Sequence, residues 1–328
     1  MPDKPFIVYA TIFTAVLVIT VLLERALIPM LRKRAEQPIY TDGPRWHEKK
    51  SGTPTMGGLA FLISITLSLS VASIYLYTIG NVEGATSLLI SLGFSVANAI
   101  IGLIDDVRKL QRKENLGLTA KEKLILQAVA AVGFLVLRGV FLENPTTLSF
   151  SFGLLDAGAI YYPIALLILL GLVNMANLTD GIDGLAGGVA FASAVSIFYL
   201  SCTLTVESAV ASAAIIGGTL GFLFFNVNPA RVFMGDTGSL FLGALTVSSC
   251  FMLSNPLITL SVNSVYIIEG LSVILQVICF KLTGKRVFKM APLHHHLEKS
   301  GWSENKICYA AIIITLLSSI PAYILYTP

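Results

Sequence analysis

Apolar runs of about 20 residues recur along the whole chain and are separated by short polar segments. A helix of about 20 apolar residues crosses the roughly 30 Å hydrocarbon core of a bilayer. The pattern therefore predicts an all-α, polytopic integral membrane protein with about ten transmembrane helices. The expected helices cover residues 5–30, 56–77, 86–106, 121–138, 160–178, 185–205, 209–227, 238–254, 257–282 and 306–326.

Composition agrees with a membrane protein. Only 12% of the 328 residues are charged, whereas about a quarter are charged in a soluble domain. The chain shows no repeat period, so we expect one transmembrane catalytic domain over 1–328. Residues 6–23 lack a basic leader and a cleavage site, which predicts a retained helix rather than a signal peptide. Partial alternation over 149–155 predicts a short hairpin.

The basic residues are unevenly distributed among the loops. Nineteen of the 22 Lys and Arg lie in the segments 32–50, 108–123 and 281–306 or at Arg231. Since cytoplasmic loops of membrane proteins are enriched in Lys and Arg, these segments are expected in the cytoplasm and both termini outside.

One polar stretch, residues 174–185, interrupts an otherwise apolar region. Residues three apart share a helix face, so a continuing helix would align four polar side chains: Asn174, Asn177, Asp180 and Asp183. Gly181 and Gly184 would allow close backbone approach and a positive φ. Such residues at a membrane surface are typical of a phosphate or metal site. The alternative is a polar turn between two spans.

Two further polar groups are expected on the same side. Lys50 and Thr55 belong to a Gly- and Thr-rich segment, 49–58, whose hydroxyls and glycine amides could form an anion seat at a helix N-terminus; a membrane-flanking loop with a helix cap is the alternative. Asp105 and Asp106 end the third helix, beside the negative end of its dipole, where stability does not favour acids. A bound cation or a catalytic role explains them better. Adjacent residues point about 100° apart, so we expect different roles for the two.

Each of the remaining polar residues has two possible roles. Lys121 and Lys123 either serve the site or anchor a helix at the membrane. Asp236 either binds an ion or caps a helix, and Phe233 either stacks on a nucleobase or contacts the membrane surface. The run His294, His295 and His296 favours phosphate binding or proton handling over a zinc site, because consecutive side chains rarely share one metal; a surface run without function is the alternative.

Five ordered motifs resemble the phospho-N-acetylmuramoyl-pentapeptide transferase family. They are GTPTMGG at 52–58, DD at 105–106, NLTDGIDG at 177–184, NPARVFMGDTGS at 228–239 and PLHHHLE at 292–298. They extend over nearly the whole chain. Leu297 departs from the aromatic residue expected there, which affects only local packing.

The resemblance implies a reaction and its cofactor. UDP-MurNAc-pentapeptide and undecaprenyl phosphate would give lipid I and UMP with Mg²⁺, at the inner membrane of a bacterial cell. It further implies a homodimer in a lipid bilayer and no nucleic-acid partner. Direct attack by the lipid phosphate is expected rather than a covalent phospho-enzyme, because that phosphate is already largely ionised near neutral pH.

The resemblance also implies roles for particular residues. Asp236 would bind Mg²⁺, Asp105 would lie nearest the lipid phosphate, and Asp106 would support the metal or phosphate. Phosphates and sugar would be held by Lys50, Lys121, Asn177 and the three histidines. Thr55 and Asp180 would also bind substrate. The uridine seat would comprise Gly181, Asp183 and Phe233.

Three other functions fit parts of the sequence. A related transferase could load GlcNAc-1-phosphate from UDP-GlcNAc onto the lipid phosphate. A transporter would need polar groups through the membrane midplane, where Glu269 is the one clear acid. An intramembrane prenyltransferase also uses paired Asp residues with Mg²⁺, but it would not need residues for uridine.

Overall fold

The computed structural model describes residues 4–33, 50, 52–112, 117–142, 146–253 and 255–326, and it is nearly all α-helical. The longer helices are α1 (Lys4–Leu31), α2 (Gly58–Thr78), α3 (Val82–Arg112), α4 (Ala120–Phe141), α5 (Tyr161–Thr179), α6 (Leu185–Leu204), α7 (Val206–Asn226), α8 (Gly235–Phe251), α10 (Ser264–Thr283) and α12 (Glu304–Ser318). The shorter elements are β1 (Thr147–Phe150), β2 (Gly153–Asp156), the 3₁₀ helix η2 (Gly158–Ile160), α9 (Ile258–Val262), α11 (Leu293–Glu298) and α13 (Ile320–Tyr326).

The prediction of a polytopic membrane protein is confirmed. Among the described residues, nine helical segments are long and apolar enough to cross a membrane. The expected eighth span corresponds to α8, which has only 17 residues and is buried from Thr237 to Phe251. It therefore lies within the bundle, surrounded by other helices rather than by lipid.

Three further expectations concern local structure. The predicted hairpin is confirmed, with Thr147 opposite Asp156 in an antiparallel pair. The expected helix 257–282 is not continuous, because Asn263 separates α9 from α10. The last expected helix is likewise divided, at Ser319, into α12 and α13.

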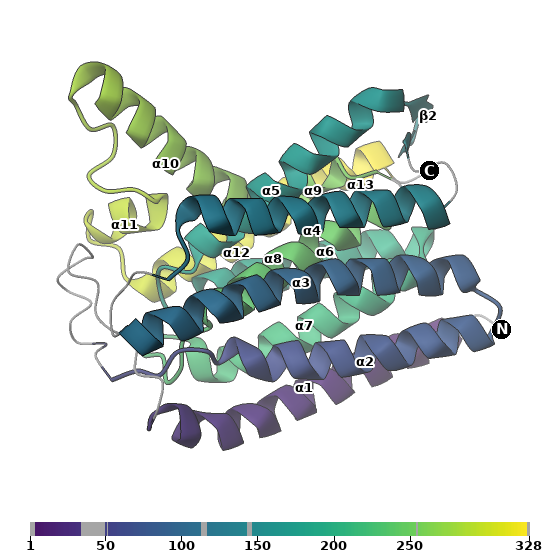
Figure 1. Cartoon of the computed structure of the whole chain (residues 1–328), viewed down its shortest axis with the longest axis horizontal. Coiled ribbons are helices and arrows are strands. Elements are labelled where there is room, and N and C mark those ends of the chain that lie inside the picture. Colours follow the sequence, from purple (N-terminus) through teal and green to yellow (C-terminus); the bar gives the residue numbers. More distant parts are fainter. Residues whose placement is uncertain are drawn as a thin grey trace.

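The two ends of the bundle differ in what they carry (Figure 1). Both chain termini and the β1–β2 hairpin lie at one end, and α11 lies at the other. The hairpin is joined to the C-terminal helix, since the amide of Ser151 donates to the carbonyl of Leu325 over 2.8 Å. The first turn of α8 and the end of α3 come together at the end opposite the hairpin, which is where the site is built.

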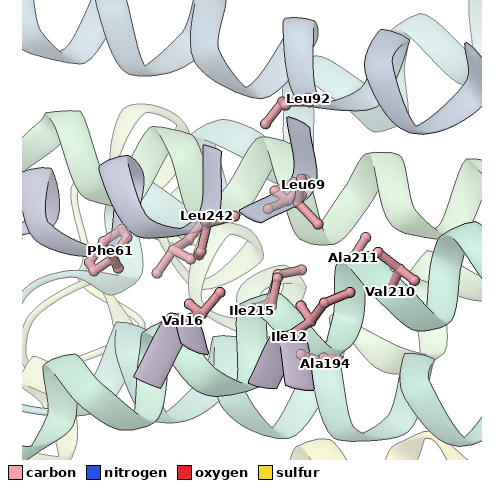
Figure 2. Packing of buried hydrophobic residues seen from close by; sticks show 14 of the residues in the cluster. Ile12, Val16, Phe61, Leu69, Leu92, Ala194, Val210, Ala211, Ile215 and Leu242 are labelled. Carbon is pink, nitrogen blue, oxygen red and sulfur yellow. The ribbon is translucent and has the colours of Figure 1, made fainter. Parts of the chain in front are cut away.

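The core of the bundle consists of interlocking apolar side chains from helices distant in sequence. Figure 2 shows Ile12 and Val16 of α1 beside Ile215 of α7, with Leu69 of α2 and Leu242 of α8 in the same cluster. All of these side chains are at least 90% buried. In lipid, close packing of this kind replaces the hydrophobic effect as the main force between helices.

Glycines permit the closest helix contacts. A Cβ on Gly217 of α7 would lie 2.5 Å from the carbonyl oxygen of Phe13 in α1. A Cβ on Gly102 of α3 would lie 2.3 Å from the carbonyl oxygen of Asp236 in α8. The second contact fixes the end of α3 against the beginning of α8, and so positions the acidic residues of both.

Candidate active site

Three aspartates converge where α3 meets α8. Carboxylate oxygens of Asp105, Asp106 and Asp236, one from each residue, all lie within 4.8 Å of one another. Asp105 and Asp106 are buried and Asp236 is partly buried. Three like charges at this distance repel strongly, so the cluster requires neighbouring cations, bound protons or a metal ion.

Asp106 is bonded to the first turn of α8. One of its carboxylate oxygens accepts the backbone N–H of Asp236 over 3.0 Å, and the other accepts the N–H and the hydroxyl of Thr237 over 2.9 and 2.6 Å. Free N–H groups at a helix start need such acceptors. The alternative that Asp236 caps this helix is therefore wrong, because Asp236 lies inside the first turn and Asp106 supplies the acceptor.

Asp105 has different surroundings from Asp106. This was expected, because adjacent residues of a helix point in different directions. One of its oxygens accepts the N–H of Leu118 over 2.6 Å, and the other pairs with Lys109 at 2.6 Å. Lys109 lies one turn further along α3 and also reaches Asp236, at 3.1 Å. Lys109 therefore bridges Asp105 of α3 and Asp236 of α8.

Asp236 is the most heavily contacted of the three acids. Its Oδ2 pairs with Lys123 at 2.9 Å as well as with Lys109. Its Oδ1 accepts from Asn177 over 3.0 Å, and Asn177 in turn accepts from Lys123 over 3.0 Å. Helices α3, α4 and α5 therefore each bring a polar side chain to this carboxylate of α8.

The cluster suits a divalent cation of the magnesium type. Its acidic ligands offer only oxygen, the donor that Mg²⁺ prefers, and Mg²⁺ is usually held by one or two carboxylates together with substrate phosphates. Both oxygens of Asp106 already accept hydrogen bonds from α8, whereas one oxygen of Asp105 and one of Asp236 pair with lysine side chains. Asp105 and Asp236 are thus the better placed to take an ion.

A second polar group surrounds Asp183. Lys50 pairs with one oxygen of Asp183 and with Glu304 of α12, both at 2.7 Å. The other Asp183 oxygen accepts from the amide of Asn228 and from the backbone of Ala230, over 2.9 and 3.0 Å. A cavity of about 450 Å³ adjoins this group, lined by Asn228, Glu304 and Trp302 among others.

The polar stretch after α5 does not form the single stripe expected. Helix α5 ends at Thr179, and Gly184 adopts the positive φ of +77° that glycine allows. Asn177, near the end of α5, contacts Asp236, whereas Asp183, in the turn that follows, contacts Lys50. Asp180 lies between the two groups, and burial raises the pKa of its carboxyl to about 7, helped by the negative charges of Asp236, Asp106 and Asp183.

The expected anion-binding segment before α2 cannot use the amides of Gly57 and Gly58, because both are already bonded within the protein. The N–H groups of Gly57 and Gly58 donate to the carbonyls of Phe233 and Met234 over 2.9 and 3.0 Å. The amide of Phe233 donates in return to the carbonyl of Pro54 over 2.8 Å. These amides therefore tie two loops together and are not available to an anion. Thr55 is buried between the same loops.

The three histidines point to different partners, which agrees with the argument against one shared metal. His294 is fully buried, and its Nδ1 lies 3.1 Å from Glu269 of α10. His295 lies 2.7 Å from Glu298, and His296 accepts the N–H of Lys289 over 3.1 Å.

The other nitrogen of His294 faces the turn after α5. A Cβ on Gly181 would lie 2.2 Å from its Nε2, so only glycine fits there. That Nε2 is buried without a hydrogen-bond partner. Glu269, whose carboxylate also accepts the backbone N–H of His294, therefore sets the orientation of this ring.

The structure brings most of the expected site residues to this end of the bundle. Phe233 is partly buried on the loop before α8, and Lys121 is exposed in the first turn of α4. Lys123, for which a role in the site was one of two interpretations, contacts Asp236. Three residues that contact the two groups were not expected: Lys109, Asn228 and Glu304. The spacing of four between Asp105 and Lys109 could have revealed the first, but Glu304 lies 121 residues from Asp183 and only the fold brings them together.

Comparison with known proteins agrees with this geometry. Residues 88–254 match the glycosyl transferase family 4 model, and residues 50–62 match signature 1 of phospho-N-acetylmuramoyl-pentapeptide-transferases. The chain is 46% identical over 305 residues to the phospho-N-acetylmuramoyl-pentapeptide-transferase of Halalkalibacterium halodurans, covering 92% of each chain. It is 43% identical over 311 residues to that of Heliobacterium modesticaldum, again covering 92% of each.

Fold, site and family model together define a membrane-embedded glycosyl transferase of family 4. Within that class, the chain belongs to the phospho-N-acetylmuramoyl-pentapeptide-transferase family.

Proposed function

We propose that the protein transfers phospho-MurNAc-pentapeptide from UDP-MurNAc-pentapeptide to undecaprenyl phosphate, giving lipid I and UMP. The observation that carries this proposal is the convergence of three aspartates, two lysines and Asn177 at one end of a membrane-spanning bundle. One substrate lies in the bilayer and the other in water, so their reaction requires a site at such an end.

The reaction exchanges one phosphoanhydride bond for another. An oxygen of the lipid phosphate bonds to the β-phosphorus of the UDP-sugar, and the bond from that phosphorus to the bridging oxygen of UMP breaks. No base need remove a proton, because the attacking phosphate is largely ionised near neutral pH. The protein therefore has to position two anions and offset their repulsion.

The charged residues divide this work. Asp236 and Asp105 would hold Mg²⁺, which when bound supplies positive charge to the phosphates. Lys109 and Lys123, now paired with these acids, are within reach of the same phosphates. Asp106 keeps the first turn of α8 in place. Lys121, exposed beside them, is proposed to contact the sugar phosphate from the aqueous side.

The second polar group is proposed to recognise the nucleotide. Asp183 offers a carboxylate fixed by Asn228 and the backbone, which suits the single N–H group of the uracil ring in a nucleotide. Phe233 would stack on that ring, and Gly181, whose missing side chain makes room for His294, would lie beside it. Lys50, already bonded to Asp183, would balance the charge of the nucleotide.

His294, held by Glu269, lies against Gly181, between the nucleotide group and the lipid-facing helix α10. Its unpaired Nε2 is therefore proposed to contact a substrate phosphate. His295 and His296, bonded to Glu298 and to the Lys289 backbone, are proposed to support the sugar side of the site.

The experiment that tests the function uses purified protein, Mg²⁺ and undecaprenyl phosphate, with either UDP-MurNAc-pentapeptide or UDP-GlcNAc. UMP release with the muramoyl substrate only is the expected result. Release with UDP-GlcNAc only would contradict the proposal and favour the related GlcNAc-1-phosphate transferase activity.

We also infer that the site faces the cytoplasm of a bacterial cell and that the protein works as a homodimer. The bias of Lys and Arg supports the first inference. A cysteine introduced at Lys299 should resist impermeant thiol reagents added to intact cells. Strong labelling would show that this loop faces the outside of the cell. The homodimer is tested by measuring the mass of the protein in native membrane nanodiscs. Detection of the monomer alone would contradict it.

A further inference from the structure

A second polar cavity lies at the end of the bundle opposite the aspartates. It has a volume of about 230 Å³, and its lining includes Glu83, Ser87, Arg138, Tyr161, Thr205 and Glu207. Arg138 follows Lys123 by 15 residues on α4, which corresponds to about 22 Å along a helix. The cavity is therefore separate from the site described above and lies near the other membrane surface.

Arg138 lacks partners for part of its guanidinium. The group carries five N–H donors. It donates to the carbonyl of Phe251 over 2.9 Å and, more weakly, to Ser87 over 3.5 Å, and it also interacts with the hydroxyl of Tyr161. Only 8% of the residue is exposed, and its Nε is buried without a partner. Among the described residues, no carboxylate lies within ion-pair distance of it.

A second donor in the cavity is also buried without a hydrogen-bond partner. The hydroxyl oxygen of Thr205 is buried and has no hydrogen-bond partner. An unpaired buried donor is costly, whereas one that meets an acceptor is not. Arg138 and Thr205 therefore call for a ligand that brings oxygen acceptors into this cavity.

The two glutamates restrict which ligand that can be. Glu83 and Glu207 lie in the first turns of α3 and α7, where the helix dipole favours acids. With Arg138 they give the lining one more negative than positive charge, which disfavours a simple anion such as inorganic phosphate. A ligand that carries both a phosphate and a cation satisfies both sets of residues.

The surroundings of the cavity favour a lipid as the source. Exposed apolar side chains flank it on α3 and α4: Val82, Leu89, Val140 and Phe141. Acyl chains would lie against this surface while the headgroup enters the cavity. Carboxylates accept hydrogen bonds from a primary ammonium but not from a trimethylammonium, so they distinguish between common headgroups.

We propose that this cavity binds the headgroup of a zwitterionic phospholipid with a primary ammonium, as in phosphatidylethanolamine. The phosphate contacts Arg138 and Thr205, and the ammonium contacts Glu83 and Glu207. The proposal is independent of the catalytic assignment, because no residue of the cavity belongs to the site at the other end.

The test measures lipid binding to delipidated full-length protein in detergent, by native mass spectrometry and by the shift in Tm. Dioleoyl phosphatidylethanolamine should bind at least tenfold more tightly than dioleoyl phosphatidylcholine. Glu207→Gln should abolish that preference, and Arg138→Gln should weaken both lipids at least tenfold. Arg25→Gln, an exposed arginine on α1, is the matched control and should bind like wild type.

Thr205→Val keeps the test decisive if Arg138→Gln does not fold. It removes one donor, leaves the guanidinium in place, and should weaken phosphatidylethanolamine severalfold. Equal binding of both lipids by wild type and by Glu207→Gln would overturn the proposal. Equally tight binding of free phosphoethanolamine would also overturn it, since the ligand would then be a soluble ion.

Discussion

Asp106 at the end of α3 holds Thr237 by two hydrogen bonds, from its backbone N–H at 2.9 Å and from its hydroxyl at 2.6 Å. Asp106, which the family resemblance implied would support the metal or phosphate, is thus a capping acceptor for the helix that carries Asp236. This relationship explains why two adjacent acids have different surroundings and predicts different effects of the same substitution.

Asp106→Asn should lower stability, and Asp105→Asn should lower mainly activity. An amide at residue 106 would turn its NH₂ group toward one of the three α8 donors, and hydrogen bonds to a charged acceptor contribute about 1.5–3 kcal/mol each. The Tm of Asp106→Asn should therefore fall by several degrees in detergent. A wild-type Tm for Asp106→Asn would show that the cap is unimportant. Thr237→Val, which keeps the backbone N–H, serves as the milder control.

Lys123 and Lys121 form a matched pair in the first turn of α4. Lys123 contacts Asp236 and Asn177, whereas Lys121 is exposed. Lys123→Met should therefore lower kcat about 100-fold or more, since electrostatic groups at the reacting centre have effects of this order. Lys121→Met should chiefly raise KM. Steady-state kinetics for both variants check this. A larger loss of kcat in Lys121→Met than in Lys123→Met would show that Lys121, and not Lys123, acts at the reacting centre.

These results show which parts of the molecule could be predicted from the sequence. Apolar runs predicted the membrane helices because lipid requires about 20 apolar residues for each crossing. They could not show that α8 is enclosed, since a helix buried in protein is as apolar as one exposed to lipid. The break at Asn263 was also missed, because the residues on both sides of it are apolar and continue the pattern of a single helix.

Within the site, residue types were easier to predict than pairings. The motifs brought attention to Asp105, Asp236 and Asp183, but their lysine partners were not all identified. Lys121 and Lys123 look alike in sequence, and only the direction of α4 makes one contact Asp236. The condition on which the single stripe depended, one continuous helix through Asp183, is not met, because α5 already ends at Thr179 and the chain turns before α6 begins at Leu185.

Phe233→Ala should weaken binding of the UDP-sugar by about 1–3 kcal/mol, the range for a base stacked on an aromatic ring. The backbone of Phe233 makes the loop contacts to Pro54 and Gly57, so truncation of the side chain should leave them intact. Phe233→Tyr keeps the ring and should bind nearly as wild type. Calorimetric titration with UDP-MurNAc-pentapeptide measures this, and unchanged affinity in Phe233→Ala would remove the residue from the nucleotide site.

Asp180 should make stability depend on pH when no metal is bound. Burial raises the pKa of its carboxyl to about 7 in the folded protein, from an ordinary value of 3.8. The folded state then binds more protons than the unfolded state between these values, so stability falls as pH rises from about 4 to about 7.

The slope cannot exceed about 1.4 kcal/mol per pH unit for one group. Thermal unfolding in EDTA should show this decline in wild type and a smaller one in Asp180→Asn. Identical pH profiles for the two proteins would mean that Asp180 ionises normally.

The central claim, that Asp236 carries the metal on which transfer depends, is tested most directly with Asp236→Asn. This change removes the charge but keeps the size, and Asp106 continues to cap α8 through backbone N–H groups that the substitution does not alter. The variant should fold with a Tm near that of wild type, lose the stabilisation that Mg²⁺ gives to wild type, and release UMP at least 100-fold more slowly. Near-wild-type UMP release by a folded Asp236→Asn at ordinary Mg²⁺ would contradict the account.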